Sequence, residues 1–136
     1  MSIGEFIQNN DVEYTHNIVD ENTIGLIEKE LKILFGDELK QYIMKYGYLS
    51  YRHIEFYGIN SIQMIDSDMI KQTSYLHMYF PKTEGYIALG NYGDGEYVIV
   101  SSDDMVYEYD SEMDTIRETK KKLFDYILEV FIGIDA

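Results

Sequence analysis

The sequence of 136 residues predicts an α+β fold in which helices cover one face of a mostly antiparallel sheet. Apolar residues recur at helical spacing in the first third of the chain, in the middle and again at the C-terminus. Between the last two of these regions, short runs of alternating residues are separated by polar turns, as in a meander. That order of elements is typical of a single antiparallel-dominated sheet. We expect one domain over residues 1–136, with its core at about 22–132. The chain has only one proline and no low-complexity stretch, so no segment has the composition of a linker between domains.

The N-terminal third predicts two helices after a short amphipathic turn at residues 3–7. Asn22-Thr23 is the expected cap of the first helix, whose apolar residues follow at spacings of three and four: Ile24, Ile27, Leu31 and Leu34. Gly36 suits the left-handed residue that ends such a helix. The second helix is expected over about 37–46, and Gly47 ends it in the same way.

The middle of the chain predicts a strand and a further helix. Residues 51–59 alternate between apolar and polar side chains, which indicates a strand. Asp66 or Ser67 can cap the helix, whose apolar positions extend to Phe80. Pro81 ends it, because proline disfavours helical geometry in the residue before it.

The rest of the chain predicts a meander and a last helix. The strands are expected at residues 86–89, 96–100 and 105–109. The polar turns at 91–95 and 101–104 connect them, so the last two strands form a hairpin. Thr119 or an earlier residue opens the last helix, whose inward residues are Leu123, Phe124, Ile127, Leu128 and Phe131. Lys120 to Lys122 are expected to be exposed.

The charge of the chain is its most informative bulk property. It has 25 acidic residues against 11 basic ones, a formal net charge of −14. Such a field repels nucleic acid and anionic lipid and favours encounter with basic partners. Between Glu84 and Glu118 there are ten acidic residues and one basic residue, Arg117. The alternative is that this acidity only keeps the protein soluble.

The sequence offers no catalytic residue, no cofactor site and no metal site. The absence of cysteine excludes disulfides, thiolate metal sites and a cysteine nucleophile. Neither of the glycine-rich phosphate-binding loops nor the nucleophile elbow of hydrolases is present. His16, His53 and His77 lack the spacing of a zinc site, and a hydrogen-bonded structural role fits each of them. We therefore predict a binding protein and not an enzyme.

The sequence also predicts where the protein works. Its N-terminus lacks the basic and apolar regions of a signal peptide, and no apolar run approaches the ~20 residues that span a bilayer. We expect a cytoplasmic protein that binds neither membranes nor nucleic acid. No oligomeric state is predicted.

Three runs, Thr23 to Glu28, Phe35 to Leu39 and Tyr42 to Gly47, resemble in their order the opening of the SUKH superfamily. This is the group of Smi/Knr-like domains common among bacterial immunity proteins. Phe35-Gly36 stands where the family has leucine-proline, and Gly47-Tyr48 replaces asparagine-glycine.

Two later segments, Tyr46 to Gly58 and Gly93 to Tyr107, resemble the subset of the family carried in Bacillus-type toxin loci. The whole likeness covers roughly residues 22–132. It implies N-terminal helices packed on a curved, mostly antiparallel sheet, with a further helix in mid-chain and one at the C-terminus.

The resemblance also implies a function, which is to bind and neutralise a cognate polymorphic toxin, often a nuclease, in the cytoplasm. It supplies no catalytic residues. The alternative is a regulatory or small-ligand-binding module, because some relatives act in the regulation of cell-wall synthesis. An apolar pocket with convergent polar groups would favour the alternative, and a flat acidic face would favour toxin binding.

A nuclease toxin holds phosphates in a cationic groove, which an acidic and tyrosine-rich face could cover. The candidate electrostatic residues are Asp94, Glu96, Asp103, Asp104, Glu108 and Asp110. The candidate aromatic anchors are Tyr92, Tyr97, Tyr107 and Tyr109, although alternate ones must point into the core. The alternative for these acids is an ordinary solvated hairpin.

Overall fold

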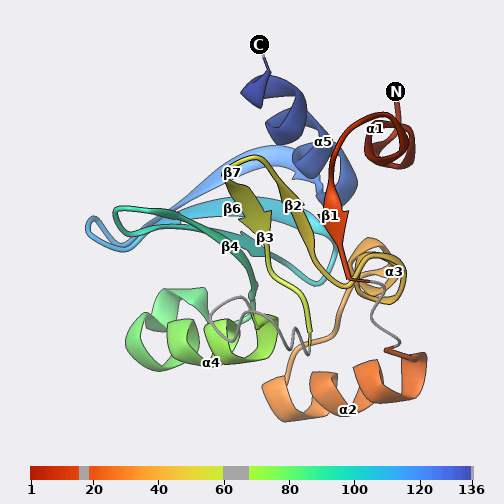
Figure 1. The fold of residues 1–136 in the computed structure, drawn as a ribbon. Coiled ribbons are helices and arrows are strands. Elements are labelled where there is room, and N and C mark those ends of the chain that lie inside the picture. The colour runs from red at the N-terminus through yellow and green to blue at the C-terminus, as the bar shows by residue number, and fades with distance from the viewer. Residues whose placement is uncertain (16–18, 60–67, 136) are drawn as a thin grey trace.

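Two antiparallel sheets and five α-helices form the part of the chain that a computed structural model describes, residues 1–15, 19–59 and 68–135 (Figure 1). The α+β class is thereby confirmed, whereas the expectation of a single sheet is wrong, because the strands divide into two sheets. The small sheet has the order β1-β2-β3: Glu13–Tyr14, Leu49–Tyr51 and Ile54–Phe56. The larger, curved sheet has the order β4-β5-β6-β7: Ile87–Gly93, Glu96–Val100, Met105–Asp110 and Thr115–Lys122.

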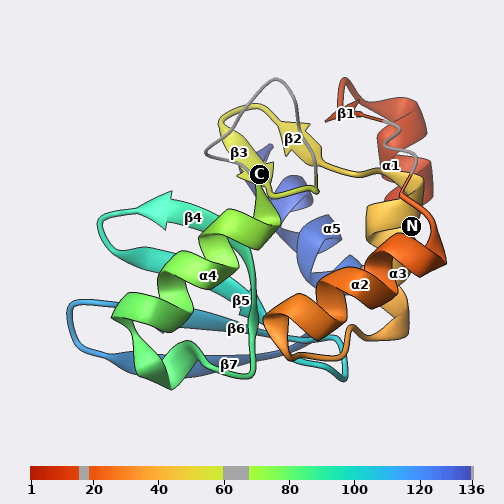
Figure 2. The same cartoon turned by 90° about the horizontal axis from the view of Figure 1, so that it is seen from below.

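The α-helices are α1 (Ile3–Asn9), α2 (Glu21–Leu31), α3 (Asp37–Lys45), α4 (Met69–Tyr79) and α5 (Leu123–Ile134). A short 3-10 helix, η2 (Pro81–Thr83), follows α4. Helix α4 covers one face of the larger sheet and α5 lies on the other side (Figures 1 and 2). The N-terminal helices contact the other helices, with α1 on α5 and α2 against α3 and α4. The small sheet adjoins the larger one, because the Tyr57 N–H donates to the Leu89 carbonyl at 2.7 Å.

The helix ends near residues 20–36 differ from the prediction. Asp20, and not Asn22-Thr23, caps α2, since its carboxylate accepts the backbone N–H of Thr23 at 2.8 Å. Lys32 takes the left-handed conformation that ends α2, with φ 59°. Leu34 therefore lies outside the helix and is 72% exposed. Gly36 has φ −72° and begins α3 instead of ending α2.

The predicted C-terminal ends of α3 and α4 are confirmed. Gly47 is left-handed after α3, with φ 70°, as expected. Helix α4 ends just before Phe80 and Pro81, also as expected. Asp68 caps α4, because its side chain accepts the N–H of Ile70 at 2.8 Å. The predicted caps, Asp66 and Ser67, lie outside the described residues.

One strand prediction and one helix prediction were wrong. Residues 51–59 do not form one strand; the chain turns at Arg52, where φ is 56°, and makes the hairpin of β2 and β3. The last helix does not open at Thr119, because residues up to Lys122 belong to β7 and α5 begins at Leu123. Strand β7 is an edge strand, and its many charged side chains are exposed, so no apolar alternation marks it.

An aromatic cluster joins the N-terminal helix, the small sheet and α5. Phe131 of α5 is fully buried among the rings of Phe6, Tyr51 and Phe56, with centroid distances of 5.5–5.8 Å. Phe6 and Tyr51 also meet edge to face, with centroids 5.1 Å apart. Rings in this geometry contribute beyond their buried area. The cluster therefore fixes α5 against the small sheet.

Candidate functional site: an acidic face of the larger sheet

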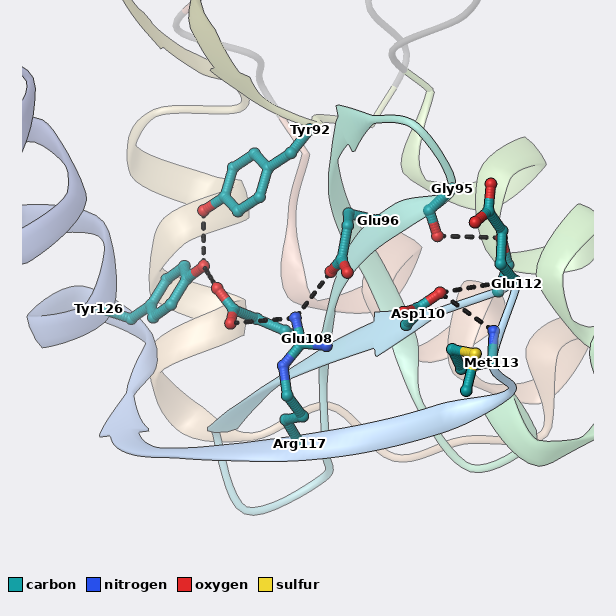
Figure 3. Close-up of polar contacts among 10 residues, drawn as sticks. Tyr92, Gly95, Glu96, Glu108, Asp110, Glu112, Met113, Arg117 and Tyr126 are labelled. Atoms are coloured by element: carbon teal, nitrogen blue, oxygen red, sulfur yellow. Dashed lines mark hydrogen bonds and ion pairs between the residues drawn. The ribbon is translucent and has the colours of Figure 1, made fainter.

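Strand register places three of the predicted acidic residues on one face of the larger sheet. Glu96 of β5 lies opposite Asp110 of β6, and Glu108 of β6 lies opposite Arg117 of β7. Alternate side chains of a strand point to opposite faces, so these residues share one face (Figure 3). We call Glu96, Glu108 and Asp110 the acidic face.

Arg117 neutralises part of the acidic face. Its Nη2 lies 2.7 Å from Glu96 Oε2 and 3.6 Å from Glu108 Oε1. The hydrogen bond to Glu96 raises the pKa of Arg117, and the charge of Glu108 acts in the same direction. One guanidinium faces three carboxylates, which leaves an excess of negative charge. Because the Arg117 side chain is 48% exposed, the ion pairs are screened and contribute at most about 1 kcal/mol to stability.

A pair of tyrosines fixes Glu108 from the side of α5. The Tyr126 hydroxyl donates to Glu108 Oε2 at 2.9 Å, and the Tyr92 and Tyr126 hydroxyls are 2.5 Å apart. Tyr126 is only 6% exposed, and Tyr92 is partly buried, at 38% exposed. This burial raises the pKa of Tyr92 to about 12 and raises the pKa of Tyr126 well above its usual range. Their phenols therefore stay protonated, and Tyr126 remains a hydrogen-bond donor to Glu108.

An open groove of about 650 Å³ runs beside the acidic face, between α5, β7 and the β2–β3 hairpin. Tyr92, Tyr126, Glu108 and Arg117 form part of its lining, and Ile54 and Val130 add apolar surface. Arg117 is paired with Glu96, and the other long basic side chain in the lining, Lys121, is paired with Glu129 at 3.0 Å. Among the described residues that line the groove, each lysine and arginine therefore already has an acidic partner.

Three of the four predicted tyrosine anchors lie on the opposite face of the sheet. Tyr109 is fully buried, and its ring centroid is 5.7 Å from that of Phe80, which follows α4. Tyr97 is half-buried against the same phenylalanine, at 6.3 Å. Tyr107 is half-buried against Tyr86, at 5.3 Å. Only Tyr92 shares a face with the acidic residues.

The remaining predicted acids lie in turns. Asp94 is exposed in the β4–β5 turn, with φ 53°. Asp103 is exposed in the β5–β6 turn, where a hydrogen bond from Ser101 lowers its pKa. Asp104 is only 5% exposed, and its carboxylate accepts the N–H groups of Glu38 and Leu39, both at 3.0 Å. Because Asp104 caps α3, it does not belong to an accessible surface.

Sequence reasoning missed Tyr126 and the role of Arg117. Tyr126 lies between Leu123 and Ile127 in an apolar helix, and a buried tyrosine needs a partner for its hydroxyl. Arg117 is the only basic residue in the acidic segment, which was a signal of pairing.

The histidines do not form a metal site in the part of the chain that the structure describes. His77 Nε2 lies 2.8 Å from the Tyr86 carbonyl, and His53 lines the groove. His16 lies outside the described residues. Among the described ranges, no cluster of three or more histidine, cysteine, aspartate or glutamate residues could hold a metal ion. The helices of these ranges are all too short or too polar to cross a membrane.

Comparison with known families covers nearly the whole chain. A family model described as SUKH_5, SMI1-KNR4 cell-wall, matches residues 3–132. The chain belongs to the SUKH superfamily. The matched range of this SUKH domain contains the acidic face, α4 and all of the groove lining except Gly133 and Ile134. No curated protein matches the chain.

We expect the protein to lose stability at alkaline pH because of the tyrosines that line the groove, Tyr92 and Tyr126. Tyr92 has a pKa raised to about 12 in the folded SUKH domain, against about 10 in an unfolded chain. Its protonated form therefore stabilises the fold fully below pH ~10, and this contribution is lost as the pH rises from ~10 to ~12. Urea unfolding below and above pH ~10 should show that the free energy of unfolding decreases as the pH rises. This decrease should be smaller in Tyr92→Phe than in the wild type. Equal decreases in the two proteins would contradict the assignment.

Proposed function

We propose that this SUKH domain is an immunity protein that binds and neutralises a cognate toxin, a nuclease with a cationic substrate groove, in the cytoplasm. The observation that carries the proposal is the acidic face, where Arg117 pairs with two carboxylates, Glu96 and Glu108, and Asp110 adds a third negative charge, on a chain of net charge −14. The family match is consistent with this role. The proposed function is binding, and no reaction is assigned to the domain.

The charge distribution supports binding to a nuclease. A nuclease must present lysine and arginine side chains to phosphates, and carboxylates can occupy the same positions. Complementary charge raises the association rate and suppresses wrong partners. An immunity protein benefits from both effects, because it must bind its own toxin before nucleic acid is cut.

The contacts around Glu108 support a preorganised surface. Tyr126 holds one oxygen of this carboxylate at 2.9 Å, and Arg117 lies 3.6 Å from the other. A side chain already held in one orientation loses less conformational entropy when a partner binds. We therefore expect Glu108 to contribute more to affinity than an acid on a solvated turn, such as Asp94.

The proposal predicts a charge-dependent loss of affinity. The double substitution Glu96→Gln/Glu108→Gln keeps the shapes of both side chains and removes two charges from the acidic face. We expect roughly tenfold weaker binding of the toxin domain at low salt, mainly through slower association, and a smaller difference at high salt. The measurement is a kinetic titration against a purified basic nuclease domain of the cognate toxin.

The matched control is Asp11→Asn/Glu30→Gln, which removes two exposed charges far from the acidic face in the sequence. An equal loss with both variants would show that net charge alone matters and would remove the acidic face from the proposal. If the wild-type domain does not bind the toxin and a metabolite co-purifies instead, the regulatory or ligand-binding alternative is correct.

A further inference from the structure

The outward face of α4 is apolar in its C-terminal half, which is unusual for a helix on a protein surface. Tyr75, Met78 and Tyr79 are 44%, 73% and 62% exposed. Their spacing of three and four residues places them on one face of the helix. The opposite face is already buried in the core through residues that include Met69 and Leu76. We call Tyr75, Met78 and Tyr79 the α4 patch.

The α4 patch is held in place by rings that continue into the sheet. The ring centroids of Tyr75 and Tyr79 are 4.9 Å apart, and Tyr75 lies 6.2 Å from Phe80. Phe80 in turn contacts Tyr97 at 6.3 Å and Tyr109 at 5.7 Å. A patch supported in this way loses little entropy on binding, as is typical of aromatic anchors at interfaces.

Acidic turns border the α4 patch. The C-terminal end of α4 lies beside the β4–β5 and β6–β7 turns in both views (Figures 1 and 2). Exposed acids on and near these turns are Glu84, Asp94, Glu112 and Asp114. Lys82, the basic residue closest to the patch in sequence, bonds to the Asp114 carbonyl at 2.8 Å and lies 3.8 Å from its carboxylate. Lys71, one turn before Tyr75 on α4, is also exposed. With two lysines against four acids, the border of the patch is net negative.

This charge decides which kind of partner fits the α4 patch. Two copies of the chain would bring the same acidic turns together, each on a molecule of net charge −14. An anionic membrane surface would be repelled for the same reason. A protein with an apolar pocket bordered by basic residues is complementary to both the aromatic centre and the acidic border.

We propose that the α4 patch is an apolar anchor for the cationic toxin, an inference that rests on the proposed function. The acidic face and the α4 patch lie on opposite sides of the larger sheet, and the β6–β7 turn connects them. Asp110 accepts the N–H groups of Glu112 and Met113 at 3.0 and 3.2 Å (Figure 3). At the other end of the turn, Asp114 accepts the hydroxyl of Tyr109, which lies under α4. The toxin contacts both surfaces by crossing this turn.

The test is the double substitution Met78→Gln/Tyr79→Gln, which retains helix-forming residues at two exposed positions. The toxin domain should dissociate roughly 10- to 100-fold faster, as at other aromatic anchors, whereas the association rate and its salt dependence stay near those of the wild type. The control is Leu26→Gln/Leu34→Gln, which removes apolar side chains of similar exposure, 66% and 72%, on and after α2. This control should bind like the wild type.

The outcomes separate the inference from the proposed function. If the wild type does not bind the toxin domain, the proposed function is wrong and the inference falls with it. If the wild type binds and Met78→Gln/Tyr79→Gln binds equally well, only the α4 inference is wrong. Equal losses in the α2 control would also overturn it. Sedimentation of the protein alone is the last measurement, because a dimer abolished by the α4 substitutions would identify a second copy as the occupant.

Discussion

Phe131→Ala is expected to lower the free energy of unfolding by about 3–5 kcal/mol, the usual range for removing a buried phenylalanine ring. The side chain is fully buried, and three aromatic rings surround it at 5.5–5.8 Å. These rings come from α1, β2 and β3, so the cavity would open where three elements meet α5. Large rings cannot collapse into the space without leaving their own contacts.

The same substitution should also affect the acidic face. Helix α5 carries Tyr126, which holds Glu108, and Phe131 packs the following turns of that helix against the small sheet. Urea unfolding measures the stability, and the control is Ile132→Ala, at a position 45% exposed. The control should change stability by less than ~1 kcal/mol. A Phe131→Ala effect as small as the control would contradict the packing described for this cluster.

Local pattern predicted the elements whose burial follows one period. Helix α4 and strand β5 were predicted within a residue or two, because one face of α4 enters the core and β5 ends in a run of buried apolar residues, Val98 to Val100. Strand β7 was missed because its exposed residues are charged and Ile116 is its only half-buried aliphatic side chain. The cap of α3 was missed for a different reason. Asp104 is 65 residues from Leu39, so no local pattern contains the contact.

The acidic residues of the candidate site could be predicted, but their partners could not. Composition identified the acidic segment, and strand alternation indicated that some tyrosines must point into the core. Which face was buried depended on the positions of α4 and α5. The face on which Tyr92 lies was harder still to predict, because the register between β4 and β5 shifts between Asn91 and Gly93. Simple alternation fails at such a shift, and that irregular position is where Tyr92 meets Tyr126.

Gly58→Ala is expected to destabilise the fold by at least about 3 kcal/mol, the upper end of the range for overpacking. A Cβ atom at Gly58 would lie 1.5 Å from the carbonyl oxygen of Gly47. That atom belongs to the backbone, so no side-chain rotation relieves the overlap. Gly47 itself has φ 70° at the end of α3, which restricts how far its carbonyl can turn away.

Gly58 cannot move away from Gly47 either, because its neighbours hold it on both sides. Its carbonyl accepts the Met69 N–H that begins α4, and the Tyr57 N–H donates to β4, both at 2.7 Å. Gly25→Ala is the matched control, since no atom lies within 4 Å of its added Cβ in α2. Alanine should stabilise that helix by about 0.5–1 kcal/mol. If urea unfolding shows similar stabilities for the two variants, α3 and β3 do not meet as closely as described. If only Gly58→Ala is destabilised, the close approach of Gly58 to Gly47 is established. That approach fixes the neighbouring Tyr57, whose N–H bonds to Leu89 of β4, the strand that carries Tyr92.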